Sequence, residues 1–153
     1  MQPVQKVKSM VAMQFSDKPF GDLTLLELYA LLWLRDEVFV VGQKITAESE
    51  VDGQDPDCTH VIGRDDSGQV VATARLFLGV SPVKVGRVAV HPRLQGQGVG
   101  TQLMLYVNAL IGERPAAMSA QAHLERWYAS VGWRRVGDVY SEAEIDHVKM
   151  VRP

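Results

Sequence analysis

The stretch that decides the fold reads Val88-Ala89-Val90-His91-Pro92-Arg93-Leu94-Gln95-Gly96-Gln97-Gly98-Val99-Gly100-Thr101. Its β-branched residues predict a strand and its glycines a tight turn, and the residues that follow, to about Ile111, have the spacing of an amphipathic helix. Three glycines at alternate positions let the backbone approach a ligand with no Cβ in the way. Because the first N–H groups of a helix are unpaired and carry the positive end of its dipole, this turn is expected to bind phosphate.

The spacing of the glycines excludes two common phosphate-binding loops. A Walker A loop has Lys before its Ser or Thr, whereas Gly100 directly precedes Thr101 here. A dinucleotide-binding loop needs Gly-x-Gly-x-x-Gly and an acidic residue ~20 positions later, and that acidic residue is missing. The pattern that fits is Gln-x-x-Gly-x-Gly, formed by Gln95, Gly98 and Gly100. It resembles the pyrophosphate-binding signature of the GNAT superfamily, the acetyl-CoA-dependent N-acetyltransferases; a tight turn without a ligand is the alternative.

A second motif lies at Leu124–Trp133, where an aromatic pair, three residues, a glycine and another aromatic follow one another. It resembles the GNAT pattern Phe/Leu-Tyr-x-x-x-Gly-Phe, with Trp127 and Trp133 in place of smaller apolar residues. The two motifs together cover about residues 88–133, in the order that the superfamily requires. Further stretches resemble its ElaA subgroup, although that subgroup usually has Glu where this chain has Gly42. They are Leu31–Arg35, Val38–Val41, Val51–Gly53, Gly86–Val88, Ala120–Leu124 and His147–Met150.

The resemblance implies an α/β (α+β) architecture, the GNAT fold, with a mixed and mostly antiparallel central sheet and helices on both faces. Residues 1–12 would form a loose N-terminal extension, and residues 13–153 a single N-acetyltransferase domain. Acetyl-CoA would be the co-substrate, with its diphosphate on the N–H groups of the turn and its pantetheine arm along the strand edge. The residues assigned to it are Val88, Ala89, Val90, Arg93, Gln95, Gly96, Gln97, Gly98, Val99, Gly100, Thr101 and Gln121, which stands where many GNAT enzymes have Asn.

The resemblance also assigns Tyr128 as the acid that protonates the departing thiolate; a core tyrosine bonded to the backbone is the alternative. A backbone N–H near Val90 is the expected oxyanion donor. Arg35, Glu37 and His123 would line the acceptor pocket, or merely pair with their neighbours. The general base is open, because each candidate taken singly is more often structural. The candidates are Glu37, Glu50, His60, His91, His123 and His147.

The strand expected over residues 83–90 changes the parity of its apolar residues at Gly86 and Arg87. A β-bulge leaves such a phase change in a sequence, and the alternative is a strand buried on both faces. A bulge here would splay the two central strands and free the edge of Val88–Val90 for the pantetheine arm.

The rest of the chain alternates between helix and strand patterns, as in a layered α/β or α+β domain. Thr24 and Glu27 form a capping-box pattern for a helix that should run to about Phe39. The acidic segment Glu48–Asp57 is interpreted as a solvated loop with one helical turn, which could alternatively attract a cationic amine. The other expected elements are strands at 60–63, 70–78, 117–120, 133–140 and 147–151, and helices at 98–111 and 123–131.

The composition limits the classes of function. The 153 residues, 46% hydrophobic and 22% charged with a net charge of −2, suit one globular domain and argue against nucleic acid as the main partner. The single cysteine, Cys58, excludes an internal disulfide and a zinc site built from several cysteines, and no metal is expected. No apolar run approaches ~18 residues, so no membrane span is expected. The apolar stretch after Lys6 and Lys8 is too short for a signal peptide, which favours the cytoplasm.

The function that these patterns predict is transfer of the acetyl group of acetyl-CoA to a primary amine, by direct attack in a ternary complex. The sequence does not identify the acceptor, a small molecule or a peptide, and exposed strand edges favour a homodimer. An acyl-CoA-binding module without catalytic activity is one alternative, and a nucleotide-binding Rossmann-like domain is another.

Overall fold

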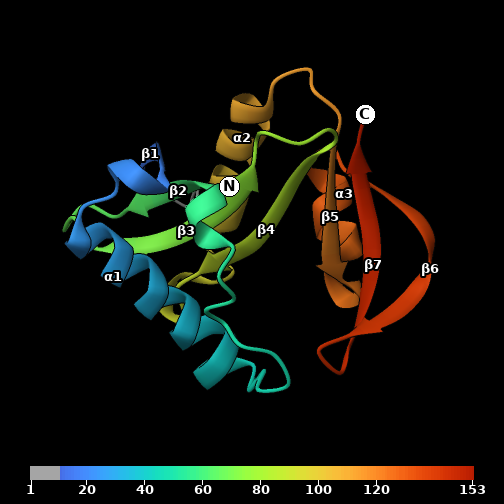
Figure 1. Cartoon of the computed structure of the whole chain (residues 1–153), viewed down its shortest axis with the longest axis horizontal. Helices are drawn as coiled ribbons and strands as arrows, with labels where there is room; N and C mark the ends of the chain where they lie inside the picture. Colours follow the sequence, from blue (N-terminus) through green and yellow to red (C-terminus); the bar gives the residue numbers. More distant parts are fainter. Residues whose placement is uncertain (1–10) are drawn as a thin grey trace, which may run out of the picture.

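The computed structural model describes residues 11–153, and within them one sheet of seven strands lies between helices (Figure 1). The strand order across the sheet is β1-β2-β3-β4-β5-β7-β6. Within this described part, β4 and β5 run parallel and the other neighbouring pairs are antiparallel. This mixed, mostly antiparallel sheet confirms the expected fold class. The strands are β1 (Gln14–Pro19), β2 (Thr59–Arg64), β3 (Val70–Phe77), β4 (Val83–Val90), β5 (Ala116–Gln121), β6 (Arg134–Glu142) and β7 (Ile145–Arg152).

The helices begin at recognisable signals. α1 (Leu25–Arg35) starts with a capping box, in which Thr24 Oγ1 accepts from the Glu27 N–H at 3.1 Å and Glu27 Oε1 accepts from the Thr24 N–H at 2.9 Å. Such a cap stabilises a helix by about 1 kcal/mol. The chain continues as a π-helix over Asp36–Gly42, so the helical segment extends beyond its predicted end at Phe39. α2 (Val99–Ile111) and α3 (Glu125–Ser130) follow later in the chain.

Apolar side chains fill both sides of the sheet. The larger cluster lies under α2, where Leu103 and Met104 pack with no exposed surface against strand residues such as Leu76. Fully burying an aliphatic side chain contributes about 1.5–3 kcal/mol, so this packing fixes α2 on the sheet. The smaller cluster, on the α1 side, consists of Leu34, Val38 and Ala89.

A β-bulge interrupts the pairing of β3 with β4, as the parity change predicts. Ala89 pairs with Thr73 and Gly86 pairs with Arg75, so that two residues of β4 lie opposite one residue of β3. One of these two, Arg87, has a φ of +49°. An extra residue bends a strand and strengthens its twist. The second half of β4 is therefore turned relative to the first.

β4 and β5 diverge beyond the bulge (Figure 1). They pair over Val83–Val85 and Ala116–Met118, and the described residues show no pairing between them further along. The edge of Val88–Val90 that faces β5 is therefore free of a neighbouring strand. On the other edge, the N–H of His91 donates to a carbonyl of β3 at 2.7 Å. Because successive N–H groups of a strand point to opposite sides, the N–H of Val90 points to the free edge.

The N-terminal part of the chain differs from its prediction. The sequence predicts no element before α1, yet Gln14–Pro19 form β1 at the edge of the sheet, paired with β2. The predicted loose extension, residues 1–12, falls almost wholly outside the described residues. At its end, the Val11 carbonyl accepts a hydrogen bond from Gln102 Nε2 at 3.0 Å. No helix of residues 11–153 is long and apolar enough to span a membrane.

Candidate functional site

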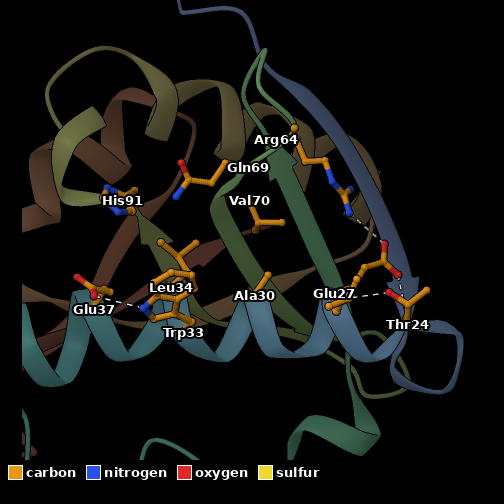
Figure 2. A pocket seen from close by; sticks show the side chains of 12 residues that line it. Thr24, Glu27, Ala30, Trp33, Leu34, Glu37, Arg64, Gln69, Val70 and His91 are labelled. Atoms are coloured by element: carbon orange, nitrogen blue, oxygen red, sulfur yellow. Dashed lines mark hydrogen bonds and ion pairs between the residues drawn. The ribbon is translucent and has the colours of Figure 1, made fainter.

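A cleft of about 1280 Å³ opens where β4 and β5 diverge. One wall is the second half of β4 with the glycine turn, and the opposite wall is a face of β5, β7 and β6. α3 and the segment that follows α1 line the rest. Because this cleft joins the predicted turn to titratable side chains, it is the candidate functional site. A second cavity of about 550 Å³ lies between α1 and the turn that joins β2 to β3 (Figure 2).

The glycine turn presents bare backbone to the cleft. Gly96 and Gly98 have φ angles of +76° and +83°, a left-handed conformation that residues with a Cβ rarely adopt. A Cβ at either position would meet no heavy atom within 4 Å, so the space in front of both is open. α2 begins directly after Gly98, and its first N–H groups have no acceptor within the helix. The turn can therefore bind an anion through backbone N–H groups.

The third glycine has a packing role. A Cβ at Gly100 would lie 3.0 Å from Trp127 Cζ2, so glycine at this position allows α2 to approach α3. Of the neighbouring residues, Val99 turns its side chain into the core and Thr101 lines the cleft. The three glycines thus divide into two that expose backbone and one that brings two helices together.

Side chains around the turn bind the protein itself. Gln95 Nε2 donates to the Val90 carbonyl at 3.1 Å, and Gln97 Nε2 donates to the Arg93 carbonyl at 2.9 Å. The Arg93 guanidinium donates to Asp65 Oδ2 on the β2–β3 turn at 2.7 Å. Hydrogen bonds from a neighbouring serine and from Arg93 lower the pKa of Asp65 to about 2, so this pair is ionised at neutral pH. The structure thus places the Arg93 side chain against the β2–β3 turn, and Arg93 does not line the cleft.

Tyr128 lines the cleft from α3, and its hydroxyl has no partner in the described part of the chain. The residue is 5% exposed, and its ring packs edge-on against Trp127, with 4.7 Å between ring centroids. The alternative of a core tyrosine bonded to the backbone therefore does not hold for residues 11–153. Burial raises the pKa of Tyr128 to about 12. The hydroxyl keeps its proton at neutral pH and can donate it to a group that enters the cleft.

Gln121 and His123 line the cleft at the end of β5. The side-chain amides of Gln121 and Gln43 bond to each other, with Gln121 Nε2 2.8 Å from Gln43 Oε1. This amide pair joins β5 to the segment after α1. His123 is exposed and lies in a 3-10 turn, Ala122–Leu124, that precedes α3. Both residues are thus placed where a ligand of the cleft can reach them.

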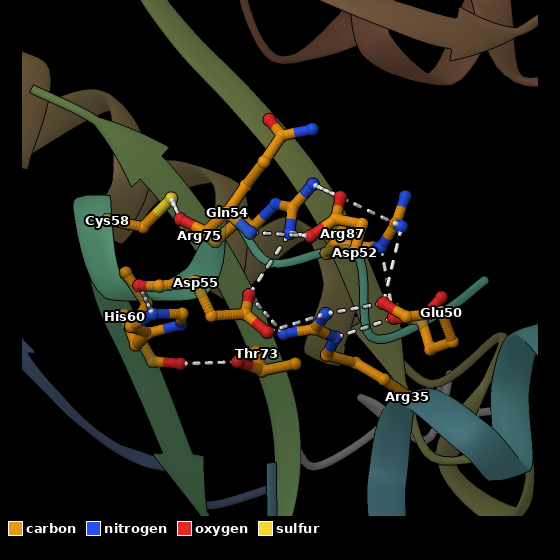
Figure 3. A network of polar contacts seen from close by, with 11 residues as sticks. Arg35, Glu50, Asp52, Gln54, Asp55, Cys58, His60, Thr73, Arg75 and Arg87 are labelled. Carbon is orange, nitrogen blue, oxygen red and sulfur yellow. Dashed lines mark hydrogen bonds and ion pairs between the residues drawn. The ribbon is translucent and has the colours of Figure 1, made fainter. Parts of the chain in front are cut away.

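The acidic segment folds into a buried cluster of ion pairs (Figure 3). Arg35, which is 1% exposed, binds Glu50 Oε1 at 2.7 Å and Asp55 Oδ1 at 2.9 Å. Arg75 binds Asp52 Oδ2 at 2.7 Å and Asp55 Oδ1 at 3.0 Å. The prediction of a solvated loop is wrong for Glu50, Asp52 and Asp55, whose carboxylates face arginines. Glu48 and Asp57 are exposed, and the predicted helical turn lies at Asp55–Asp57. Arg35 thus follows the alternative given for it: it pairs with its neighbours, and it lines neither cavity.

The same cluster holds the bulge of β4. Arg87 Nε lies 3.0 Å from Glu50 Oε1, and its Nη2 lies 3.4 Å from Asp52 Oδ2. Hydrogen bonds from Arg75 hold the pKa of Asp52 well below its ordinary value. Burial would raise the pKa of Asp55, but hydrogen bonds and charge from the arginines lower it instead. The carboxylates of the cluster are thus neutralised within the protein, which argues against the alternative that they attract a cationic amine.

Two of the candidate bases line the second cavity and not the cleft. Glu37, in the π-helix that continues α1, and His91 both line this second cavity, and Trp33 of α1 lies beside Glu37 (Figure 2). Trp33 Nε1 donates to Glu37 Oε1 at 3.3 Å. His91 Nδ1 accepts from the N–H of Arg93 at 3.2 Å, which caps the short turn after β4. Glu37, predicted for the acceptor pocket, is therefore not brought to the cleft.

The other candidate bases divide between the ion-pair cluster and the cleft. Glu50 is held by arginines. His60 is 1% exposed, its Nε2 lies 3.0 Å from a backbone carbonyl, and burial lowers its pKa. His123 and His147 line the cleft and lie outside the cluster. Cys58 is excluded as a nucleophile, because burial raises the pKa of its thiol to about 11.

Sequence reasoning missed the polar residues of the far wall. Ser119 on β5 and Tyr140 and Glu142 on β6 line the cleft. Along β5, Ser119 alternates with the buried residues Met118 and Ala120. This alternation of period two was the signal available in the sequence, since it marks a strand with one face in the core.

The comparisons with known proteins agree with this geometry. A family model described as an acetyltransferase (GNAT) domain matches residues 38–152. The chain is 36% identical to protein ElaA of Escherichia coli (strain K12) over 148 residues, which cover 91% of this chain and 95% of that protein. The crystal structure of Escherichia coli ElaA superposes with a TM-score of 0.83 at 35% identity, covering 93% of this chain and 100% of that chain.

Two further solved structures share the fold. An acyl-CoA N-acyltransferase from Pseudomonas aeruginosa is 41% identical with a TM-score of 0.81, covering 93% of this chain and 100% of that chain. A more remote structure, an aminoglycoside 6′-N-acetyltransferase complexed with coenzyme A, is 12% identical with a TM-score of 0.65. It covers 90% of this chain and 96% of its own, and it shares the fold.

Proposed function

Because the chain belongs to the GNAT acetyltransferase family, we propose that it transfers the acetyl group of acetyl-CoA to a primary amine by direct attack in a ternary complex. The observation that carries this proposal is the cleft between β4 and β5. It has an anion-binding turn at one end and a free strand edge along one wall. The similarity to an acyl-CoA N-acyltransferase of Pseudomonas aeruginosa supports the same class of reaction.

The glycine turn fits the diphosphate of coenzyme A. Backbone N–H groups from Gly96 to Thr101 would bind its oxygens, and each such contact at a helix N-terminus is worth about 0.3–1 kcal/mol, or up to ~2 kcal/mol when partly buried. A side chain at Gly96 or Gly98 would fill the space that the diphosphate needs. Arg93 has no part in this binding, because Asp65 holds its guanidinium. The remote structure complexed with coenzyme A supports the choice of ligand.

The free edge of β4 fits the pantetheine arm, whose amides can add to a strand by main-chain hydrogen bonds. The N–H and carbonyl of Val88 and the N–H of Val90 are available for this pairing, whereas the Val90 carbonyl already accepts from Gln95. Across the cleft, the Gln121 amide offers a donor and an acceptor to the same arm. Most of the hydrogen bonds to the cofactor would therefore come from backbone groups and fewer from side chains.

Acetyl-CoA supplies a thioester and a thiolate leaving group, and the protein has to move protons and stabilise an oxyanion. Tyr128 donates its proton to the sulfur, since its hydroxyl is protonated and has no partner among the described residues. The N–H of Val90 donates to the oxyanion. The amine must be neutral when it attacks, so a base has to take its proton first. His123 and His147 are the candidate bases that line the cleft outside the ion-pair cluster.

Ligand binding and turnover test the proposal separately. A ligand at ~100 times its Kd stabilises a protein by ~2.7 kcal/mol, so coenzyme A should raise the melting temperature clearly, and ATP or NAD should not. Turnover is measured as thiol release with a panel of primary amines. Binding of acetyl-CoA without thiol release on any amine would favour the alternative, a binding module without catalytic activity.

A pair of glycine variants tests the diphosphate site. Gly98→Glu puts a carboxylate where the anion binds and should abolish coenzyme A binding. Gly68→Glu is the matched control, because Gly68 has a φ of +84° and equally open space but lies on the β2–β3 turn. Unchanged affinity in Gly98→Glu would move the diphosphate elsewhere.

A further inference from the structure

The far wall of the cleft carries a row of polar side chains, of which the proposed cofactor binding uses only Gln121. Across β5, β7 and β6, Gln121 pairs with His147, and His147 pairs with Tyr140, so the three share one face. Ser119 pairs with Lys149, two residues along from the Gln121–His147 pair and so on the same face. All of these side chains line the cleft. The wall therefore presents acid–base groups to a molecule that enters opposite β4.

A chain of hydrogen bonds fixes the protons around Glu142. Ser119 Oγ donates to Glu142 Oε2 at 2.9 Å. Because a hydroxyl has one proton to donate, the contact between Ser119 and the Tyr140 hydroxyl is one in which Tyr140 donates. Glu142 Oε2 accepts at the end of this chain of hydrogen bonds. The Tyr140–Ser119 chain holds this carboxylate in place.

The same carboxylate lies beside the ring of His147. His147 Nδ1 is 2.7 Å from the Ile145 carbonyl, which can only accept, so Nδ1 carries a proton. In the neutral ring the lone pair is then on Nε2, which lies 3.4 Å from Glu142 Oε2. When Nε2 takes up a proton, this contact becomes an ion pair between the imidazolium and the carboxylate. His147 is 7% exposed and stacks with Tyr140, so its ring is fixed in this orientation.

His123 is the other candidate base in the cleft, and it lacks contacts like those that His147 makes with the Ile145 carbonyl and Glu142. Its ring forms no hydrogen bond or ion pair with residues 11–153, so neither its tautomer nor its charged form is stabilised by a partner. The titratable groups in contact with His147 are Tyr140, which stacks on its ring, and Glu142, both on β6. Lys149 on β7, His123 in the turn before α3 and Tyr128 on α3 also line the cleft; β5 contributes the neutral Ser119 and Gln121.

We propose that His147 is the general base of the transfer, held by the Ile145 carbonyl and Tyr140, and that Glu142 stabilises the imidazolium. This inference rests on the proposed acetyl transfer. The acceptor enters as an ammonium ion and gives one proton to His147 Nε2. The N–C bond then forms and the thioester C–S bond breaks, its electron pair goes to sulfur, and a second amine proton reaches sulfur by way of Tyr128. The proton on His147 leaves to solvent, so one proton is released for each acetyl group transferred.

His147→Asn tests the proposal, because Asn keeps a donor for the Ile145 carbonyl but has no lone pair at the position of Nε2. We expect kcat at pH 7 to fall by about 10²–10⁴-fold, the usual contribution of a general base, with unchanged affinity for acetyl-CoA. The deficit should shrink as the pH rises, since more of the amine is then neutral in solution. Glu142→Gln should give a smaller loss of the same kind. Asp146→Asn is the matched control with wild-type kinetics expected, because the side chain of Asp146 faces the other side of β7.

Three results would overturn either the role of His147 as the general base or the proposed acetyl transfer. Wild-type kcat and pH profile in His147→Asn, or a loss found instead in His123→Asn, would remove His147 as the base while acetyl transfer stands. Absence of thiol release by the wild-type protein with every amine would overturn the proposed function, and this inference with it. His147→Gln serves as a second variant, and circular dichroism melting curves show which variants are folded.

Discussion

Replacing Asp55 by Asn tests whether the buried ion-pair cluster holds the fold together. Asp55 is 5% exposed, and its carboxylate accepts from Arg35 at 2.9 and 3.3 Å and from Arg75 at 3.0 Å. The variant keeps the shape of the side chain but removes the charge that both arginines, 1% and 6% exposed, face. Removing one partner of a buried ion pair costs about 3–5 kcal/mol. We expect the free energy of unfolding to fall by this amount.

Urea unfolding with linear extrapolation measures the loss, and the m-value should stay unchanged because both proteins expose the same surface. Asp57→Asn is the matched control: Asp57 is exposed in the same 3-10 turn, and its change should stay within about 0.5 kcal/mol. A loss in Asp55→Asn below about 1 kcal/mol, the range of an exposed ion pair, would refute the reasoning. It would mean that Glu50 and Asp52 satisfy the arginines without Asp55.

The same variant has a pH dependence of definite sign. The pKa values of Asp52 and Asp55 lie lower in the folded protein than in the unfolded chain, where an aspartate has a pKa of about 3.9. Such a group contributes stability that is present above about pH 4 and is lost as the pH falls through the lower, folded-state value. The stability difference between wild type and Asp55→Asn should therefore narrow below about pH 4. A difference that widens on acidification would contradict this origin.

Three further outcomes are expected. Tyr128→Phe should lower kcat by about 10²-fold or more without changing acetyl-CoA affinity; equal rates in steady-state assays would remove Tyr128 from the chemistry. Arg93→Ala should leave coenzyme A affinity unchanged in titration calorimetry, because Asp65 holds the guanidinium; a large loss would mean that the side chain moves to the ligand. Cys58 should react with a thiol reagent only on unfolding, since burial raises its pKa to about 11, and rapid labelling of the native protein would count against the buried position.

Sequence signals that act within a few residues predicted the helices and strands next to the site. The capping box at Thr24, the parity change at Gly86 and the positive-φ glycines of the turn each act within a few residues. The helix after the turn was accordingly predicted at 98–111 and lies at Val99–Ile111. The divergence of β4 from β5 followed from the bulge, because an unpaired edge needs a strand that turns away from its neighbour.

The ion-pair cluster could not be predicted in the same way, because its partners are far apart in the sequence. Asp52 binds Arg75, 23 positions later, and Glu50 meets Arg87, 37 positions later. Taken without those partners, a run of carboxylates has the composition of a solvated loop. β1 was missed for a related reason: Gln14–Pro19 is mostly polar, and its pairing with β2 makes it a strand.

The sequence predicted the part of the candidate site that backbone groups form. It predicted less of the part in which side chains choose among several possible partners. The sequence located the glycine turn, but it could not show that Asp65 takes the Arg93 guanidinium. The six candidate bases could not be separated either. Choosing His147 requires the Ile145 carbonyl and the Glu142 carboxylate, which a hairpin brings to the two sides of one ring.

The extra residue at the bulge makes the site depend on chain length as well as on chemistry. With the start of β4 held in register, deleting one codon at position 87 or 88 would remove the bulge, and Ala89 and Val90 would keep their partners Thr73 and Ala72 on β3. The strand would lose the bend and the added twist that turn its second half away from β5. Such a deletion would leave the glycine turn and Tyr128 in the sequence and still close the strand edge along which a thioester could lie.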